Sequence, residues 1–345
     1  MRATELTGAE YGGYREFLGR MPLALFYHSL EFKDLVEREL GQTPRYLLLK
    51  DGEQIRGILP CFLKDNPRHG NVLNSLPFFG SNGGILLDSE HDTPGNRKLL
   101  LDAFLDLARS SGCISAVIIT SPFEERFDEY RDGLKPDLMD QRIGQVTELK
   151  PDNLELFSTM RRRGVLKAKK AGITVGIEQE VSNADLLRFY DMHCQNMDRV
   201  SGIKKTYSMV SALNGCPSSR VILARENGEL TAGLLCLYFN RTVEYYIPVF
   251  DEEHKNSHAL SLAIYEGMNR AYADGFQYWN FGGTWLSQDG VYTFKQHFGA
   301  VGKPYYYYIK LFREPGYFKA LGRQTLLEDY PWCYVIPFSA LEGGQ

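Results

Sequence analysis

Two distant stretches of this chain follow the same pattern. Residues 46–63, YLLLKDGEQIRGILPCFL, and residues 221–239, VILARENGELTAGLLCLYF, each place two apolar runs around an Asp-Gly or Asn-Gly pair. Such a pair between apolar runs is a strong signal for a β-hairpin. In both stretches a second glycine follows the turn glycine by five residues: Gly52 and Gly57, then Gly228 and Gly233. The chain is therefore predicted to contain two copies of one structural unit.

The segments after each hairpin also match. The first hairpin is followed by SLPFFGSNGGILL, a helix-like stretch at 96–112 and the apolar run ISAVIIT. The second is followed by TVEYYIPVF, a helix-like stretch at 257–275 and YWNF. Each half thus reads hairpin, strand, helix, strand, which predicts an α/β (α+β) fold of two tandem domains, each a mixed sheet with helices on its faces. We expect a first domain at 1–149, a second at 150–313, and a tail at 314–345 that packs on the second.

Composition agrees with an ordinary globular protein of two domains. The chain has 345 residues, of which 43% are hydrophobic and 24% are charged. A net charge of -4 argues against a protein that coats DNA. The sequence shows neither a secretory signal nor a long apolar run, and its six cysteines form no C-x-x-C pair, so we expect a cytoplasmic protein without structural zinc and with at most peripheral membrane contact.

A basic segment lies near the expected boundary between the domains. Residues 158–175, STMRRRGVLKAKKAGITV, contain six cations and no acid. Such a cluster is suited to phosphate groups through charge-assisted hydrogen bonds, and we take Arg162, Lys167 and Lys170 as candidates. The alternative is a solvated helix face without a ligand.

The most unusual residue is Lys295. It lies in GVYTFKQHFG, residues 290–299, surrounded by aromatic residues and shortly after YWNFGGTW, residues 278–285. Taken with the order of elements, these segments resemble the Fem-type aminoacyl and peptidyl transferases, within the GNAT acyltransferase superfamily of tandem GNAT-like domains. The resemblance covers residues 20–312, and its most specific part is the Asn-Phe-Gly-Gly segment followed by a Phe-Lys pair.

The resemblance implies catalytic roles for Lys295 and Phe294. In the family this lysine lies where the donor ester meets the acceptor amine, and an ammonium there can stabilise the developing oxyanion. An aromatic wall would restrict water. The alternative is a strand-end lysine that lies over aromatic rings without a catalytic role.

The resemblance also implies substrate-binding residues. Arg199 in NMDRVSGI resembles an arginine that contacts substrate phosphate, although its spacing to the next glycine is one residue longer. Lys33 in FYHSLEFKDL resembles a phosphate-contacting lysine of the first domain, and Tyr246 in VEYYIPV falls on the strand that faces the cleft. Gly282 and Gly283 complete the expected site. For each of the first three, an ordinary surface or packing role remains the alternative.

The donor is constrained by one turn. GNAT acetyltransferases bind the coenzyme A pyrophosphate at an R/Q-x-x-G-x-G/A turn that opens a long helix. The corresponding segments here read HKNSHA at 254–259 and DTPGNR at 92–97, and neither has the first glycine. This favours aminoacyl-tRNA as donor over acyl-CoA, which stays an alternative; no tightly bound cofactor and no metal are expected. The chain also lacks room for the helical arm of some Fem enzymes, so it resembles the armless branch, found in envelope or exopolysaccharide pathways.

We therefore expect an acyltransferase that forms an amide on an amine-bearing cell-envelope or nucleotide-linked substrate. The partner would be a phosphate-bearing small molecule or a lipid-linked substrate, with tRNA as a further candidate. Two alternatives stay open: an acyl-CoA-dependent N-acetyltransferase acting on an amino sugar, and a non-catalytic tandem-GNAT binding or scaffold protein.

Overall fold

The computed structural model describes residues 1–77, 82–200 and 202–342. The chain forms two compact units, the first made of Met1–Arg142 and Pro304–Gln345, the second of Ile143–Lys303. We call them unit 1 and unit 2. The expected second domain began at 150 and ended at 313, so each boundary lies several residues earlier than expected. Residues 78–81, within the predicted SLPFFGSNGGILL segment, are outside the described residues.

Unit 2 is built on one mixed sheet with the strand order β10-β11-β12-β13-β14-β9. The strands are β10 Thr174–Glu178, β11 Ser219–Glu226, β12 Glu229–Phe239, β13 Thr242–Phe250, β14 Tyr278–Thr284 and β9 Leu138–Glu148. Neighbouring strands are antiparallel except β13 and β14, which run parallel. A parallel neighbour needs a crossover, and α8, Ala259–Ala273, provides it.

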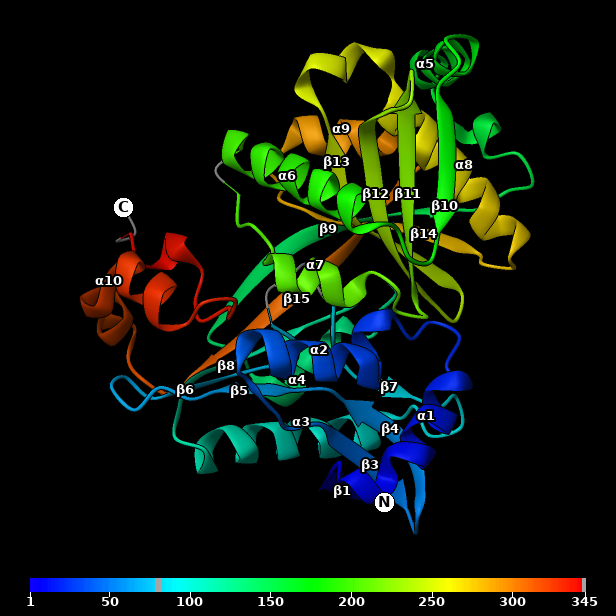
Figure 1. The fold of residues 1–345 in the computed structure, drawn as a ribbon. Helices are drawn as coiled ribbons and strands as arrows, with labels where there is room; N and C mark the ends of the chain where they lie inside the picture. Colours follow the sequence, from blue (N-terminus) through cyan, green and yellow to red (C-terminus); the bar gives the residue numbers. More distant parts are fainter. Residues whose placement is uncertain (78–81, 201, 343–345) are drawn as a thin grey trace. The chain divides into compact units, whose positions relative to one another are not determined.

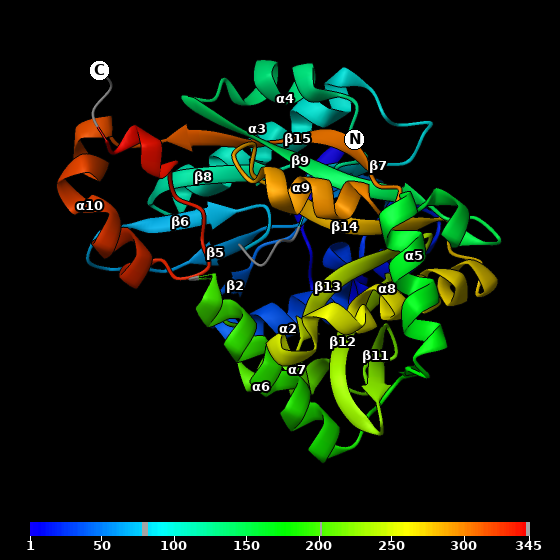
Figure 2. The ribbon, with the colours of Figure 1, turned by 90° about the horizontal axis from the view of Figure 1, so that it is seen from above.

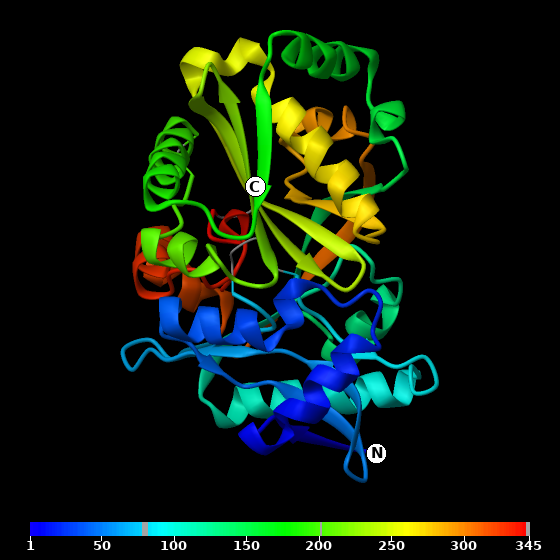
Figure 3. The ribbon, with the colours of Figure 1, turned by 45° about the vertical axis from the view of Figure 1, so that its right-hand side comes forward.

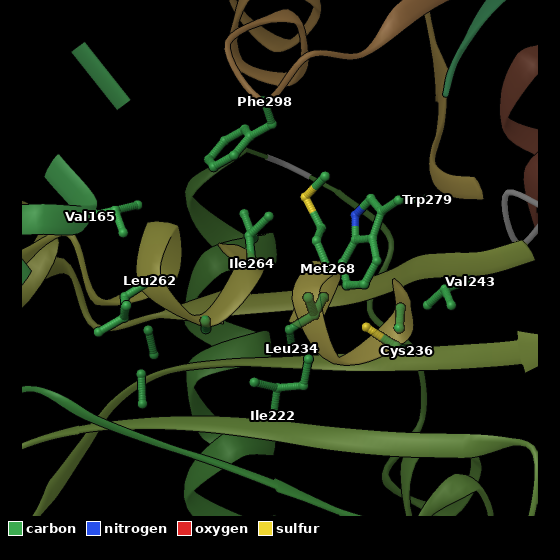
Figure 4. Packing of buried hydrophobic residues seen from close by; sticks show 14 of the residues in the cluster. Val165, Ile222, Leu234, Cys236, Val243, Leu262, Ile264, Met268, Trp279 and Phe298 are labelled. Carbon is green, nitrogen blue, oxygen red and sulfur yellow. The ribbon is translucent and has the colours of Figure 1, made fainter. Parts of the chain in front are cut away.

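Helices cover both faces of this sheet (Figure 1, Figure 3). On one face lie α8 and α5, Thr159–Lys170, over a core centred on Trp279, Met268 and Ile222 (Figure 4). On the other lies α6, Asn183–Arg199, with its Phe189 ring close to Gly233. Two shorter helices complete the unit, α7 Tyr207–Leu213 and α9 Asp289–Gln296. The mixed α/β class expected from the sequence is confirmed.

Unit 1 repeats this plan with two sheets, ordered β1-β3-β4-β7 and β15-β8-β6-β5-β2. Its strands are β1 Arg2–Glu5, β2 Thr43–Pro44, β3 Leu47–Asp51, β4 Gln54–Leu59, β5 Phe62–Lys64, β6 Asn71–Asn74, β7 Leu86–Leu87, β8 Cys113–Ile119 and β15 Val301–Leu311. Its helices are α1 Tyr11–Gly19, α2 Leu30–Leu40, α3 Pro94–Ser110, α4 Phe127–Leu134 and α10 Pro315–Asp329. Strands β6 and β8 run parallel, and α3 connects them.

The sequence repeat appears as two matching hairpins. β3 and β4 pair around Gly52, and β11 and β12 pair around Asn227-Gly228. These three turn residues have positive φ of 56°, 53° and 86°, as the Asp-Gly and Asn-Gly signals predict. Both hairpins also carry a register shift one or two residues before the turn. The predicted helices at 96–112 and 257–275 are α3 and α8.

The predicted place of the tail was wrong. Phe318, Leu326 and Tyr330 pack against Val72 and Ile114 of unit 1, not against the second domain. The tail follows β15, whose second half pairs with β8 of unit 1, so the chain has already returned to the first sheet (Figure 2). The aromatic residues of the tail gave no indication of which sheet they cover.

Within the described ranges, no helix is long and apolar enough to cross a membrane. The same part of the chain contains no group of three or more His, Cys, Asp or Glu side chains that could hold a metal ion.

Candidate functional site

Strands β13 and β14 separate after a short pairing. Only Thr242–Glu244 pairs with Tyr278–Asn280, although both strands continue further. Beyond this point the pairing of β14 with β9 shifts register between Asn280 and Gly283. Gly282 has a φ of 72°, which explains why glycine is needed in this bulge. The Asn-Phe-Gly-Gly motif is therefore the place where two parallel strands part.

A buried side-chain pair marks the last paired residues. Asn280 Nδ2 donates to Glu244 Oε2 at 2.9 Å, and both residues are almost fully buried. The Asn280 Oδ1 atom accepts from the backbone N–H of Gly282 at 2.9 Å. Asn280 therefore connects β13 to the bulge, and it holds the Gly282 backbone in its unusual conformation.

Lys295 lies on α9 and points at this bulge. Its Nζ donates to Gly282 O at 3.1 Å, to Gly283 O at 2.9 Å and to Thr284 Oγ1 at 2.9 Å. An ammonium has three hydrogens, and here each has an acceptor. The sequence led us to expect a lysine among aromatic rings, with a strand-end position as the alternative; the structure shows it on a helix, with oxygen atoms around its charge.

Burial lowers the pKa of Lys295 to about 7. The side chain is 6% exposed, so the charged form loses most of its solvation. The three acceptor oxygens act in the opposite direction, because hydrogen bonds to the ammonium favour it. The group therefore lies close to the midpoint of its titration at neutral pH, a property often found in catalytic residues.

Two further polar residues, which the sequence reasoning missed, continue from Lys295. Thr284 Oγ1 donates to Gln145 Oε1 at 3.0 Å, and Gln145 Nε2 donates to the backbone carbonyl of Tyr292 at 2.9 Å. Thr284 directly follows the two glycines, so its position in the motif was a usable signal. Gln145 lies on β9, far away in sequence, and no local pattern identifies it.

Phe294 packs against the core, and its ring contacts the guanidinium of Arg161. Its ring lies 5.1 Å from that of Phe298, and the Arg161 guanidinium lies over it at 4.8 Å from the ring centroid. Arg161 is half-buried and donates to Ser261 Oγ at 3.4 Å, and within the described residues it forms no ion pair with a carboxylate. Burial lowers its pKa. A direct catalytic part for Phe294 stays a prediction.

The basic segment divides between two environments. Arg162 and Lys170 are exposed on α5, and Arg162 donates to the backbone carbonyl of Glu155. Arg161 and Lys167 are close enough to His258 for their charges to lower its pKa, after the larger effect of burial. His258 is the N-cap residue of α8. The structure therefore gathers Arg161, Lys167 and His258, rather than all the predicted cations, at the start of this helix.

A close contact holds this arrangement. A Cβ on Gly164 of α5 would lie 2.9 Å from His258 Nδ1, so glycine lets α5 approach the imidazole ring. His258 itself has a φ of 62°, which is rare for a residue with a side chain. It lies in the HKNSHA segment, which corresponds to the pyrophosphate turn of GNAT acetyltransferases and lacks its first glycine.

The other predicted residues lie elsewhere in their units. Arg199 forms an ion pair with Glu252, and its guanidinium lies 4.6 Å from the centroid of the Phe250 ring. Tyr246 is buried on β13, and its ring lies 4.7 Å from Lys205 Nζ. Burial lowers the pKa of Lys205 to about 8.

In unit 1, Lys33 is held by two carboxylates. Its Nζ donates to Asp34 at 2.7 Å and to Glu37 at 3.1 Å. Burial acts to lower the pKa of Lys33, but these two acids raise it above its usual value. A phosphate at Lys33 would have to displace one of them, and its predicted role stays a prediction.

Comparison with known proteins identifies the class. Residues 158–296 match the family model described as an acetyltransferase (GNAT) domain. No match was found among curated protein sequences. The structure of FemX has a TM-score of 0.70 at 13% identity, with 89% of this chain and 97% of that chain covered.

Two other solved structures are similar over most of their length. A tandem GNAT protein from the clavulanic acid biosynthesis pathway gives a TM-score of 0.57 at 10% identity, with coverage of 90% and 98%. The C-terminal domain of a putative lysylphosphatidylglycerol synthetase from Agrobacterium fabrum gives 0.54 at 14%, with coverage of 92% and 96%. The protein is thus an acyltransferase with a GNAT domain. Over about nine tenths of its length the chain has the Fem-like tandem GNAT fold.

Proposed function

We propose that the protein transfers an acyl or aminoacyl group from an activated carrier to a substrate amine, forming an amide. The observation that carries this proposal is the buried ammonium of Lys295, fixed on the Gly282 and Gly283 carbonyls where β13 and β14 part. A positive charge held in a desolvated place is suited to stabilise an oxyanion that forms beside it.

The proposed chemistry uses this charge directly. The amine nitrogen forms a bond to the acyl carbon, and the carbonyl oxygen becomes an oxyanion that replaces one of the three oxygens now bound to Lys295. The bond from the acyl carbon to the carrier's oxygen or sulfur then breaks. The proton lost by the amine leaves with the carrier, so the reaction balances without a metal or a redox partner.

The donor would bind at the start of α8, where Arg161, Lys167 and His258 lie together. Positive side chains and the free N–H groups of a helix start attract phosphate. The turn departs from the usual glycine-rich pattern, and for this reason we propose the backbone phosphates beside the aminoacylated end of a tRNA as the first candidate. Acyl-CoA is the second candidate, favoured by the GNAT family match and by this cluster of cations.

The acceptor proposed is an amine on a cell-envelope or nucleotide-linked molecule that carries phosphate. Arg199, Tyr246, Lys33, Arg162 and Lys170 stay proposed contacts for it. The similar structures include FemX and the C-terminal domain of a putative lysylphosphatidylglycerol synthetase, and the second name suggests lipid chemistry as one context.

The first experiment is a thermal-shift comparison of the purified protein with coenzyme A, acetyl-CoA, UDP-linked amino sugars and charged tRNA. Binding to the folded state raises the transition temperature with the logarithm of ligand concentration over Kd. We expect thermal shifts with charged tRNA, the donor, and with a UDP-linked amino sugar, the acceptor. In Arg161→Gln the shift with charged tRNA should be lost, and the shift with the amino sugar should remain. A shift with coenzyme A, lost in the same variant, would establish the second candidate. Absence of any shift, together with absence of transfer, would favour a binding or scaffold protein.

A further inference from the structure

Two buried polar side chains lie behind Lys295 and have no role in the mechanism above. Thr284 is 2% exposed and Gln145 is fully buried. They come from different strands, β14 and β9, and meet at 3.0 Å between Thr284 Oγ1 and Gln145 Oε1. Buried polar groups cost free energy unless their hydrogen bonds are made. Here the two side chains are paired with each other, and Thr284 also binds the lysine.

Chemistry fixes the direction of each hydrogen bond in this row. The Lys295 ammonium can only donate, so Thr284 Oγ1 accepts from it and gives its own hydrogen to Gln145 Oε1. Gln145 then has its amide N–H₂ directed to the Tyr292 carbonyl. Tyr292 lies one turn before Lys295 on α9. The row therefore begins and ends on the helix that carries the lysine.

We propose that Thr284, held by Gln145, is a positioning residue for acyl transfer: it keeps the Lys295 side chain charged and directed at the end of the β13–β14 pairing. This inference rests on the proposed function of Lys295. Of the three oxygens around the ammonium, two are backbone carbonyls that no substitution removes. The third oxygen belongs to the side chain of Thr284. Thr284 is therefore the acceptor of Lys295 that a substitution can remove.

The energetic reason is that burial has already brought the lysine close to losing its proton. A hydrogen bond to a charged group is strong enough to change the pKa of that group by about one to two units. Loss of the hydroxyl would therefore lower the pKa of Lys295 further. Tyr292 and His297 on α9, Glu244 on β13 and Arg161 on α5 are the titratable or charged groups on the surrounding elements, and none of them contributes to the shift.

The test compares Thr284→Val, which keeps the shape and removes the hydroxyl, with Thr284→Ser, which keeps the hydroxyl. Transfer rates of both variants and of the unchanged protein are measured from pH 5.5 to 9.5 with the substrate pair found by the binding experiment. We expect Thr284→Val to lose least activity at low pH, where Lys295 is charged with or without the hydroxyl. At high pH it should be about ten- to a hundredfold slower, because the ammonium fraction falls tenfold per pKa unit. Thr284→Ser should restore the rate across the range.

A second readout does not need the substrate. Protein with ¹³C at lysine Cε is titrated by NMR, and the Lys295 resonance is assigned by its absence in Lys295→Arg. In Thr284→Val the midpoint of the Lys295 titration should fall by one pH unit or more. The pH at which the transfer rate declines on the alkaline side should fall by the same amount. Gln145→Leu leaves the threonine hydroxyl without its acceptor. It should lower the titration midpoint and the pH at which the rate declines, each by a smaller amount than Thr284→Val.

The outcomes are separable. A Thr284→Val protein with unchanged midpoint and unchanged pH profile would overturn the positioning role. So would a uniform loss of rate at every pH in both Thr284 variants, which is the result expected of a packing residue. If Lys295→Met kept full transfer activity while Thr284→Val still moved the NMR midpoint, the proposed function of Lys295 would fail and only the coupling would stand.

Discussion

The two units use the same structural position in different ways. In unit 1 the parallel pairing of β6 with β8 ends at Asn74 and Val117, and in unit 2 that of β13 with β14 ends at Glu244 and Asn280. The Asn74 side chain binds the backbone of Tyr334 in the tail, at 2.9 and 2.8 Å. The Glu244 side chain binds Asn280, which holds the glycine bulge under Lys295.

This difference shows how a duplicated fold can keep its chemistry in one copy. Once parallel strands part, their backbone groups need other partners. In unit 1 the tail lies beside these strands, and its backbone binds their side chains: Asn74 binds Tyr334, and Ser115 Oγ donates to Val335 O at 2.6 Å. Unit 2 satisfies the carbonyls of the bulge with a lysine whose charge remains beside the opening. We infer that unit 1 supports the fold and that unit 2 carries the transfer site.

The largest expected effect tests whether the tail packs on unit 1. Phe318 is fully buried in unit 1, and Phe189 is fully buried on α6 of unit 2. Either ring replaced by alanine should cost about 3–5 kcal/mol, but in different units. Hydrogen exchange followed by mass spectrometry should show Phe318→Ala exposing β6 and β8, and Phe189→Ala exposing β12 and β13. Loss of protection in β12 from Phe318→Ala alone would contradict the assignment of the tail to unit 1.

The next effect tests the lysine. Lys295→Met should lower the transfer rate on the order of 10²–10³-fold, the usual result of removing an oxyanion donor. Its matched control is Lys50→Met in unit 1, a lysine that is also buried but bound to Glu10 and Glu53. That variant should lose stability and keep its transfer rate per folded molecule, measured in the same assay. Equal losses of rate in both variants would remove the distinction between the units.

A pH effect of about 3 kcal/mol is expected from His28 in unit 1. Burial lowers its pKa to about 4, against 6.5 for the exposed group. The folded state therefore binds fewer protons than the unfolded state between these values, so stability is complete above pH 6.5 and falls as the pH drops towards 4. The size follows from 2.5 units at 1.36 kcal/mol each.

Unit 2 has a counterpart in His193, whose pKa burial also lowers to about 4, with smaller effects from Lys205 and Lys204. Because the pKa is lowered to the same value, we expect a loss of similar size. Urea unfolding at pH 7, 5.5 and 4.5 measures the slopes, and His28→Gln and His193→Gln should each flatten the pH dependence by a similar amount. A stability that does not change over this range would show that the buried imidazoles are not responsible.

The smallest effect compares two glycines. Gly282 in unit 2 and Gly52 in unit 1 have φ of 72° and 56°, and a Cβ on either would meet no atom within 4 Å. Alanine at either position should cost about 1–2 kcal/mol of backbone strain. Only Gly282→Ala should also change the transfer rate, because it moves a carbonyl that binds Lys295. Thermal unfolding and the transfer assay together distinguish strain from displacement of the lysine.

The sequence predicted what depends on neighbouring residues. The two hairpins follow from their Asp-Gly and Asn-Gly pairs, and α3 and α8 follow from apolar periodicity. Lys295 was selected as a candidate catalytic residue because of its aromatic neighbours and the preceding glycines. Features that depend on contacts between distant residues were not predicted. The hydrogen-bonded residues Thr284 and Gln145 are 139 positions apart, and Asn74 and Tyr334 are 260 positions apart. The Gly-Gly motif indicated Gly282 and Gly283, but no pattern indicated that their backbone carbonyls accept from Lys295.

The basic segment shows a related limit. Charge alone identified residues 158–175, but the rotation of α5 decides which cations are useful. Arg161 faces Phe294, whereas Arg162, its immediate neighbour, faces solvent. The sequence reasoning selected Arg162 and passed over Arg161, because an aromatic partner more than a hundred residues away could not be seen.

The order of the units along the chain has a consequence for synthesis of the protein. Unit 2 is continuous from Ile143 to Lys303, whereas unit 1 needs residues from both ends of the chain. Domains fold as units while the chain emerges from the ribosome. Unit 2 therefore has all its residues before most of β15 and the tail are made, and unit 1, whose first residues are made earlier, completes its sheet last.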